Sequence, residues 1–163
     1  LQESKALSIL KNRKTDNIRT RKIAVLCDDG VDGDQVDAYK DQLNGEKAMV
    51  RVVASHLGTI KDENGKEVMV DDTDITTSSV LFDALFVPDG TEEMFETMSS
   101  DTSFKEFVRD TYLHYKPIAA NGKAVGFIKK VIGEDLTTTE GIVEDGTVEE
   151  FVDAVKEARF WNR

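Results

Sequence analysis

The fold is decided by Lys116-Pro117-Ile118-Ala119-Ala120-Asn121-Gly122-Lys123-Ala124-Val125-Gly126. Residues 117–120 are short and apolar, as in a buried strand, Asn121-Gly122 is typical of a tight turn, and residues 123–132 have a helical pattern. In α/β proteins such a sharp turn often carries a nucleophile, because it lifts one side chain above the sheet beside free backbone N–H groups. This apex carries no Ser, Cys or Thr. The stretch therefore predicts an architecture rather than an activity.

Outward from this stretch, strand and helix patterns alternate along the chain. Apolar, β-branched runs predict strands at 23–27, 50–54, 81–87, 117–120 and 141–143. Helices are expected at 34–44 and 123–132, and two more are expected to begin with capping boxes, Ser103 with Glu106 and Thr147 with Glu150. The first of these two would place five aromatic or apolar residues on one face: Phe104, Phe107, Val108, Tyr112 and Tyr115.

Asn64-Gly65 lies between two short runs, 59–62 and 66–69, and predicts a β-hairpin. Strands that alternate with helices indicate a parallel sheet with right-handed crossovers. The whole pattern predicts an α/β protein: a flavodoxin-like three-layer sandwich with a central parallel sheet, helices on both faces and a projecting β-hairpin. We expect a linker or arm over residues 1–21, with the apolar knot 6–10 docked on a body, or else a frayed chain end. The single domain is expected to cover residues 22–163.

Composition narrows the classes of function. The 163 residues carry a net charge of −11, which disfavours nucleic acid and anionic membrane surfaces as partners. No apolar run is long enough to cross a bilayer. Cys27 is the single cysteine, so an internal disulfide is excluded. The chain lacks an initial Met and a signal-peptide pattern, so we expect a fragment of a longer protein, and the compartment stays open.

Three loops should meet at the carboxyl edge of the sheet, where ligands bind in this fold: 28–33, 88–90 and 121–123. The first contains four carboxylates that could attract a hard cation: Asp28, Asp29, Asp32 and Asp34. Their spacing does not match an EF-hand loop, and we favour a solvated acidic turn that supports a helix N-terminus. Cys27 is interpreted as a small buried hydrophobe. His56 and His114 lie in no metal or triad motif, so surface or helix-end roles are expected.

The order of elements, with residues 85–90 and 116–120, resembles the ThiJ/PfpI branch of the class I glutamine amidotransferase-like superfamily. In addition, residues 4–8, 19–26 and 79–90 are similar to the linker and C-terminal domain of large-subunit heme catalases of the fungal type. The first resemblance covers the chain from about Arg21 to the last helix.

The ThiJ/PfpI resemblance implies where a catalytic pair would lie. Its nucleophilic Cys falls on Gly122, the residue after it on Lys123, and its acidic partner on Gln35. Both members of the pair are therefore replaced, and no thiolate can form at the elbow. Of the usual glycine pair after the third strand, Gly90 is kept and Asp89 replaces the other, which would disturb an oxyanion site. We expect no catalytic residue, bound cofactor or metal in this domain.

The catalase resemblance implies a non-catalytic domain of a hydrogen-peroxide-degrading enzyme, whose heme lies in a catalase core of the same chain. Such enzymes are tetramers, and the extra domain is expected to stabilise them and to act as a chaperone toward unfolding client proteins. Two alternatives stay open. One is a residual ThiJ/PfpI-type hydrolase of small substrates, with Lys123 or Cys27 as replacement nucleophile. The other is a ligand-binding or gating domain.

Overall fold

The computed structural model describes residues 16–133 and 140–161. Within them lies a six-stranded sheet in which every pair of neighbouring strands is parallel. The strands, in spatial order, are β5 (Asp72–Thr73), β2 (Met49–Ala54), β1 (Lys22–Leu26), β6 (Ala84–Val87), β7 (Ile118–Ala120) and β8 (Ile142–Glu144). Without the short edge strand β5 this is the flavodoxin-like order, with the switch point between β1 and β6.

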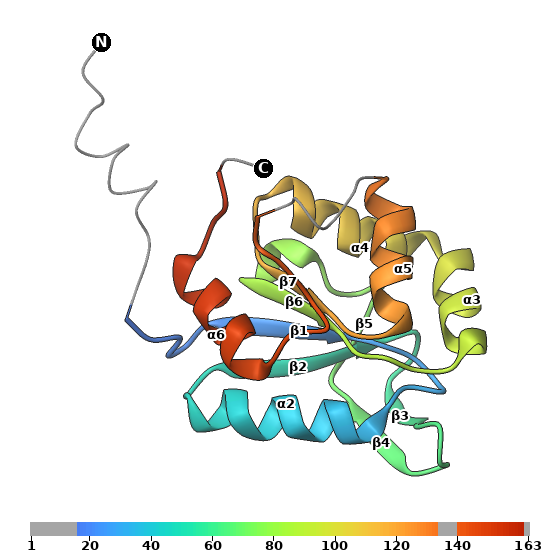
Figure 1. Cartoon of the computed structure of the whole chain (residues 1–163). Helices are drawn as coiled ribbons and strands as arrows, with labels where there is room; N and C mark the ends of the chain where they lie inside the picture. The colour runs from blue at the N-terminus through green and yellow to red at the C-terminus, as the bar shows by residue number, and fades with distance from the viewer. Residues whose placement is uncertain (1–15, 134–139, 162–163) are drawn as a thin grey trace, which may run out of the picture.

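Helices cover both faces of the sheet (Figure 1). On one face, α2 (Gly33–Gly45) packs beside α6 (Val148–Glu157). On the other face, three helices contact one another: α3 (Glu92–Ser100), α4 (Thr102–Leu113) and α5 (Lys123–Ile132). The predicted three-layer α/β architecture is confirmed.

The apolar runs are buried on both faces of the sheet, as expected for parallel strands that helices cover. All four residues of β6 are buried. On the α2 side, the ring of Phe86 stacks on Tyr39 with centroids 3.7 Å apart, and Phe151 of α6 packs beside both rings. On the other side, Phe104 and Ile128 are fully buried. Each helix therefore presents one apolar stripe to the sheet.

The predicted hairpin is confirmed as a separate antiparallel pair, β3 (Gly58–Lys61) and β4 (Glu67–Val70). Gly65 in its turn has φ +84°, a conformation that favours glycine. The hairpin lies against the loop that follows β1, because Gly30 N–H donates to the Lys61 carbonyl at 2.8 Å. This contact holds the hairpin at the carboxyl edge of the sheet, and the loop between β2 and β3, which leads into the hairpin, lies at the same edge.

Three local predictions were wrong. The strand expected over 81–87 begins at Ala84, because residues 79–81 form a 3₁₀ turn that the Ser78 side chain caps. The helix expected to begin with Ser103 begins at Thr102, since the carboxylate of Asp101 accepts the Ser103 backbone N–H. Tyr115 does not belong to this helix: it lies beyond the C-terminal end with φ +63°.

Two elements were not predicted at all, the edge strand β5 and helix α3. By contrast, Thr147 caps α6 as expected, accepting the Glu150 backbone N–H. The apolar knot 6–10 lies outside the described residues. Within the expected arm, Ile18 is fully buried and Thr20 N–H donates to the Lys47 carbonyl. No described helix is both long enough and apolar enough to span a membrane.

Candidate functional site

The elbow, which we define as residues 121–123, connects β7 to α5. Gly122 is the N-cap residue of α5, with φ +57° and ψ −125°. This positive φ strongly favours glycine, so a side chain here would strain the backbone. Gly122 N–H donates to Asp145 Oδ1 at 2.5 Å, and Asp145 follows the neighbouring strand β8. The turn is thus held between two strand ends.

The carboxylate of Asp89 fills the space above the elbow. Its Oδ1 accepts the backbone N–H groups of Gly90 at 2.8 Å and Lys123 at 3.1 Å. A Cβ atom on Gly122 would collide with both oxygens and the carboxyl carbon of Asp89. The backbone donors that would stabilise an oxyanion are therefore directed at an internal anion.

Gln35 reaches the elbow from α2, the position to which the acidic partner was assigned. Its Oε1 accepts the backbone N–H of Asp89 at 3.0 Å and Asn121 Nδ2 at 3.4 Å. Asn121 Nδ2 also donates to the Tyr39 hydroxyl at 3.3 Å. The three loops predicted to meet do so, because Asp32 N–H in the loop after β1 donates to the Asp89 carbonyl. Gln35 acts here as a hydrogen-bond bridge between strand ends.

The two alternative nucleophiles lie in different environments. Cys27 is fully buried, and desolvation together with the neighbouring Asp28 charge raises the pKa of its thiol far above the ordinary value. The thiol is therefore protonated at neutral pH. Lys123 is exposed, and it lines a groove of about 620 Å³ between α3 and α5 with Glu92 and Phe95.

Sequence reasoning missed two members of this site. Tyr39 lies within the helix expected at 34–44 and was not predicted to belong to the site, yet its hydroxyl reaches Asn121. Burial raises the pKa of Tyr39, and the hydrogen bond with Asn121 acts in the opposite direction. Asp145 was not singled out, although its place after a strand at the carboxyl edge is a usable signal.

Comparison with known proteins gives the family. A family model described as the C-terminal domain found in long catalases matches residues 19–163. The chain belongs to this catalase C-terminal domain family.

Relatives of this catalase domain come from several lineages. A catalase of Alkalihalophilus pseudofirmus is 33% identical over 152 residues, which cover 88% of this chain and 21% of the relative. Catalase-B of Dictyostelium discoideum is 32% identical, over 93% of this chain and 22% of the relative. Catalase-1 of Neurospora crassa is 28% identical, over 89% and 21% respectively. The chain thus spans about a fifth of the length of these relatives.

The four acidic residues predicted after β1 in this catalase domain have different structural roles. The carboxylate of Asp32 caps α2 by accepting Gln35 N–H, and Asp34 lies exposed in the first turn of that helix. Asp28 and Asp29 instead lie close to His56, which follows β2. The four carboxylates therefore do not form one cluster. His114, the other histidine, caps the C-terminal end of α4.

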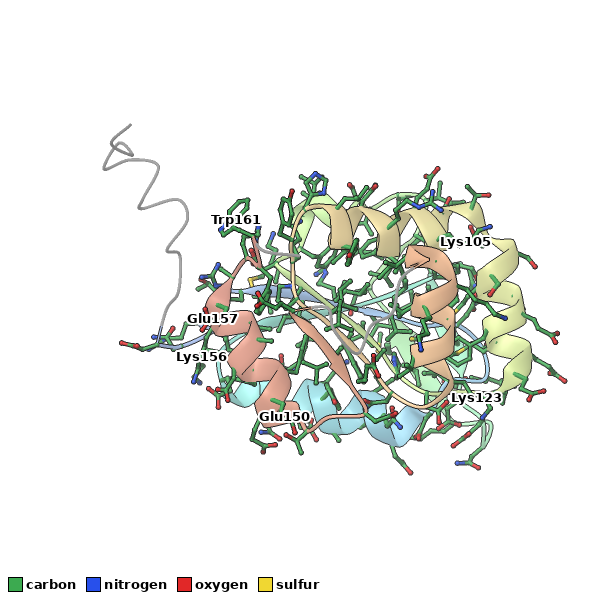
Figure 2. The ribbon with its side chains drawn as sticks, turned by 45° about the horizontal axis from the view of Figure 1, so that its top comes forward. Lys105, Lys123, Glu150, Lys156, Glu157 and Trp161 are labelled. Atoms are coloured by element: carbon green, nitrogen blue, oxygen red, sulfur yellow. The ribbon has the colours of Figure 1, made fainter. Side chains whose placement is uncertain are left out.

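At the opposite, amino-terminal edge of the sheet lies an apolar groove of about 310 Å³, lined by Val80, Tyr115, Trp161 and the polar residues His114, Lys116 and Arg159. The rings of Tyr115 and Trp161 pack 5.2 Å apart. Leu81 and Leu113, adjacent in sequence to its lining residues, are 59% and 58% exposed. Figure 2 places Trp161 and Lys123, at the elbow, at opposite ends of the molecule. The elbow and the apolar groove therefore lie at opposite ends of the domain.

Proposed function

We propose that this chain is a non-catalytic C-terminal domain of a hydrogen-peroxide-degrading heme catalase, and that it stabilises the enzyme by docking on the catalase core. The observation that carries the non-catalytic part is the Asp89 carboxylate, which fills the volume that a nucleophile at Gly122 would need. It also accepts the Lys123 backbone N–H that would otherwise be open to a substrate oxygen. Heme and peroxide chemistry then belong to the core of the parent chain.

The apolar groove, with Leu81 and Leu113 beside it, is the surface that we assign to this docking. The polypeptide joins the domain at the same edge of the sheet, where Arg21 lies 3.9 Å from Asp83 and Lys22 N–H donates to the Asp83 carboxylate. In a C-terminal domain the preceding core attaches through this end of the chain, so the core is held close to the groove. A tether of this kind gives a high effective concentration, and modest apolar contacts then suffice for docking.

The test uses the full-length parent catalase and the double variant Leu81→Glu/Leu113→Glu. Charges in a docked apolar interface cost desolvation energy, so we expect dissociation of the domain from the core. The half-life of peroxide turnover at elevated temperature should shorten severalfold, while the initial rate at 25 °C stays unchanged. Subunit mass in solution should report whether the tetramer also loosens.

The matched control is Met69→Glu/Ile75→Glu, which alters two residues that are 70% and 76% exposed and do not line the groove. This control should inactivate at the parental rate. Equal half-lives for the parent, both double variants and an enzyme truncated before residue 19 would refute the stabilising role. If the half-life shortens equally in both double variants, the assignment of the docking surface is refuted instead.

A chaperone activity is the second function that the same groove supports. Exposed apolar side chains can hold unfolding segments of other proteins, and a net charge of −11 opposes self-association. In the assembled enzyme the groove would be covered, so this activity is expected mainly of the freed domain.

A further inference from the structure

A cluster of possible metal ligands lies at the carboxyl edge of the sheet, beside the β3–β4 hairpin. Asp28 and Asp29 follow β1, and His56 lies in the loop between β2 and β3. One ligand atom from each of the three residues lies within 4.8 Å of the other two. The residues come from two loops that are separate in sequence, so the fold itself brings them together.

The hydrogen bonds of His56 determine which ring nitrogen can bind a metal. Nε2 lies 3.1 Å from the Thr59 carbonyl oxygen, which can only accept, so Nε2 carries the proton. Nδ1 therefore has the free lone pair in the neutral ring, and its hydrogen-bonding neighbour is the mobile hydroxyl of Ser55 at 3.3 Å. Metal-binding histidines typically donate their other N–H to a backbone carbonyl or carboxylate, which fixes the ring and its tautomer. His56 already has this arrangement.

Hydrogen bonds from backbone amides hold the carboxylates of Asp28 and Asp29 in place, as the Thr59 carbonyl holds the His56 ring. Asp29 Oδ1 accepts the Lys61 N–H at 2.8 Å, and Asp28 Oδ1 accepts the Asp29 N–H at 2.9 Å. Each carboxylate keeps its second oxygen for another partner. Asp28 is only 3% exposed, and no hydrogen bond to its Oδ2 occurs among the described residues. A buried carboxylate oxygen without a donor is costly unless a cation or proton compensates it.

Asp74 is a further buried carboxyl group near Asp28. It is 5% exposed, and its carboxyl group interacts electrostatically with Asp28. The ion pairs that the described residues form lie elsewhere, as between Arg51 and Asp72 or Lys66 and Asp37. The local field of Asp28 and Asp29 therefore favours a bound cation.

We propose that Asp28, Asp29 and His56 bind a divalent transition-metal ion of the Zn²⁺ type, which clasps the loop before the hairpin onto the end of β1. An imidazole nitrogen disfavours Mg²⁺ and Ca²⁺, which prefer all-oxygen sites, and suits Zn²⁺. Three protein ligands leave a coordination position for water. The role of the ion is to fix the hairpin against the carboxyl edge, independently of any function of the elbow or the apolar groove.

The test titrates Zn²⁺ alone into the chelator-stripped, dialysed full chain by calorimetry, with the variants His56→Ala and Asp29→Asn. We expect one Zn²⁺ per chain, and an affinity at least about tenfold weaker in each variant because each removes one ligand. Zn²⁺ should also raise the thermal unfolding midpoint of the parent more than that of His56→Ala. Both variants alter exposed side chains, so folding is retained.

The matched control is His114→Ala, which removes the other histidine from the far end of α4 and should leave Zn²⁺ affinity unchanged. Mg²⁺ in place of Zn²⁺ should bind much more weakly. The proposal is overturned if the parent binds no Zn²⁺, if His56→Ala and Asp29→Asn bind as tightly as the parent, or if His114→Ala loses as much affinity as His56→Ala.

Discussion

Gly122 and Asp89 share one small volume, and this pair explains why a nucleophile cannot simply be restored. In Gly122→Cys the new Cβ atom would collide with the Asp89 carboxylate. The cysteine backbone would also have to keep a φ of +57°. We expect the free energy of unfolding to fall by about 2–4 kcal/mol, from backbone strain and displacement of a carboxylate that holds two N–H groups. Urea unfolding of the variant against the parent measures this loss.

The same substitution in an Asp89→Gly background separates the two causes. Removal of the carboxylate relieves the collision and leaves the strain, so Gly122→Cys should cost about 1–2 kcal/mol less in that background. The double-mutant cycle isolates this coupling. A coupling energy near zero would contradict the view that Asp89 occupies the nucleophile's volume, whatever the stability of each single variant.

Asp74 gives a prediction about pH. Burial, then the facing Asp101 carboxyl, raise the pKa of Asp74 from 3.8 to about 7. Between these two values the folded state binds more protons than the unfolded state, so this group's contribution to stability is lost as pH rises from about 4 to 7. Asp101 and Asp28 are the charged groups that raise it, and its own backbone N–H acts in the opposite sense.

In Asp74→Asn this pH dependence should disappear. We expect the variant to gain on the order of 1–2 kcal/mol over the parent at pH 8 and to differ little at pH 4.5. Urea unfolding at the two pH values, with a chelator present, measures both differences. A difference between variant and parent that is the same at both pH values would show that Asp74 does not titrate in this range.

The site residues show what a sequence can and cannot predict. Asp89 and Gly122 lie at the carboxyl edge, as their positions just after predicted strands indicated, whereas Gln35 was singled out only by the family resemblance. Tyr39 gave no such signal, and the position of His56 after a predicted strand did not identify its partners. Tyr39 reaches Asn121, 82 positions along the chain, only after α2 packs on the sheet, and His56 meets Asp28 only after the hairpin folds onto the loop after β1.

At the scale of an element, α3 shows how a cap can be overlooked. Its cap is Thr91, but Met94 stands where a capping box would have Glu or Gln, so the familiar motif is missing. The Ser103 and Glu106 pair had the motif, yet the N-cap of that helix is Asp101, two residues before Ser103. Strongly periodic helices such as α5 were predicted within a residue because their apolar stripe is unambiguous.

Two threonines of this region make a matched test of the cap. Thr91 Oγ1 accepts the Met94 backbone N–H at 3.2 Å, so Thr91→Ala should lower the free energy of unfolding by about 1 kcal/mol. Thr97 lies exposed inside α3, where its hydroxyl only donates back to the Glu93 carbonyl, so Thr97→Ala should be neutral or stabilising by a few tenths of a kcal/mol. Thermal or urea unfolding of both variants checks the opposite signs, and Thr91→Ser should behave as the parent. Similar losses in both alanine variants would contradict the cap.

At the scale of the whole molecule, the two edges of the sheet differ in chemistry. Hydrogen bonds among the elbow, Gln35 and the hairpin satisfy much of the carboxyl edge internally. The amino-terminal edge exposes the apolar groove, and Leu81 and Leu113, next in sequence to its lining residues, are also exposed. In this fold the carboxyl edge is where ligands bind, and here Asp89 fills the elbow at that edge, while the other edge offers a surface for protein contacts.

This asymmetry gives a prediction for chaperone activity. The 163-residue chain should slow the heat-induced light scattering of an unrelated client protein, because the groove can bind exposed apolar segments while the acidic surface keeps the complex dispersed. Leu81→Glu/Leu113→Glu should lose most of this effect, since it makes the edge of the groove charged. Met69→Glu/Ile75→Glu changes net charge equally at the other end and should retain it. If the two double variants protect the client equally, charge rather than the groove is responsible, and if the unaltered chain gives no protection at molar excess, the domain's surface serves only its own enzyme.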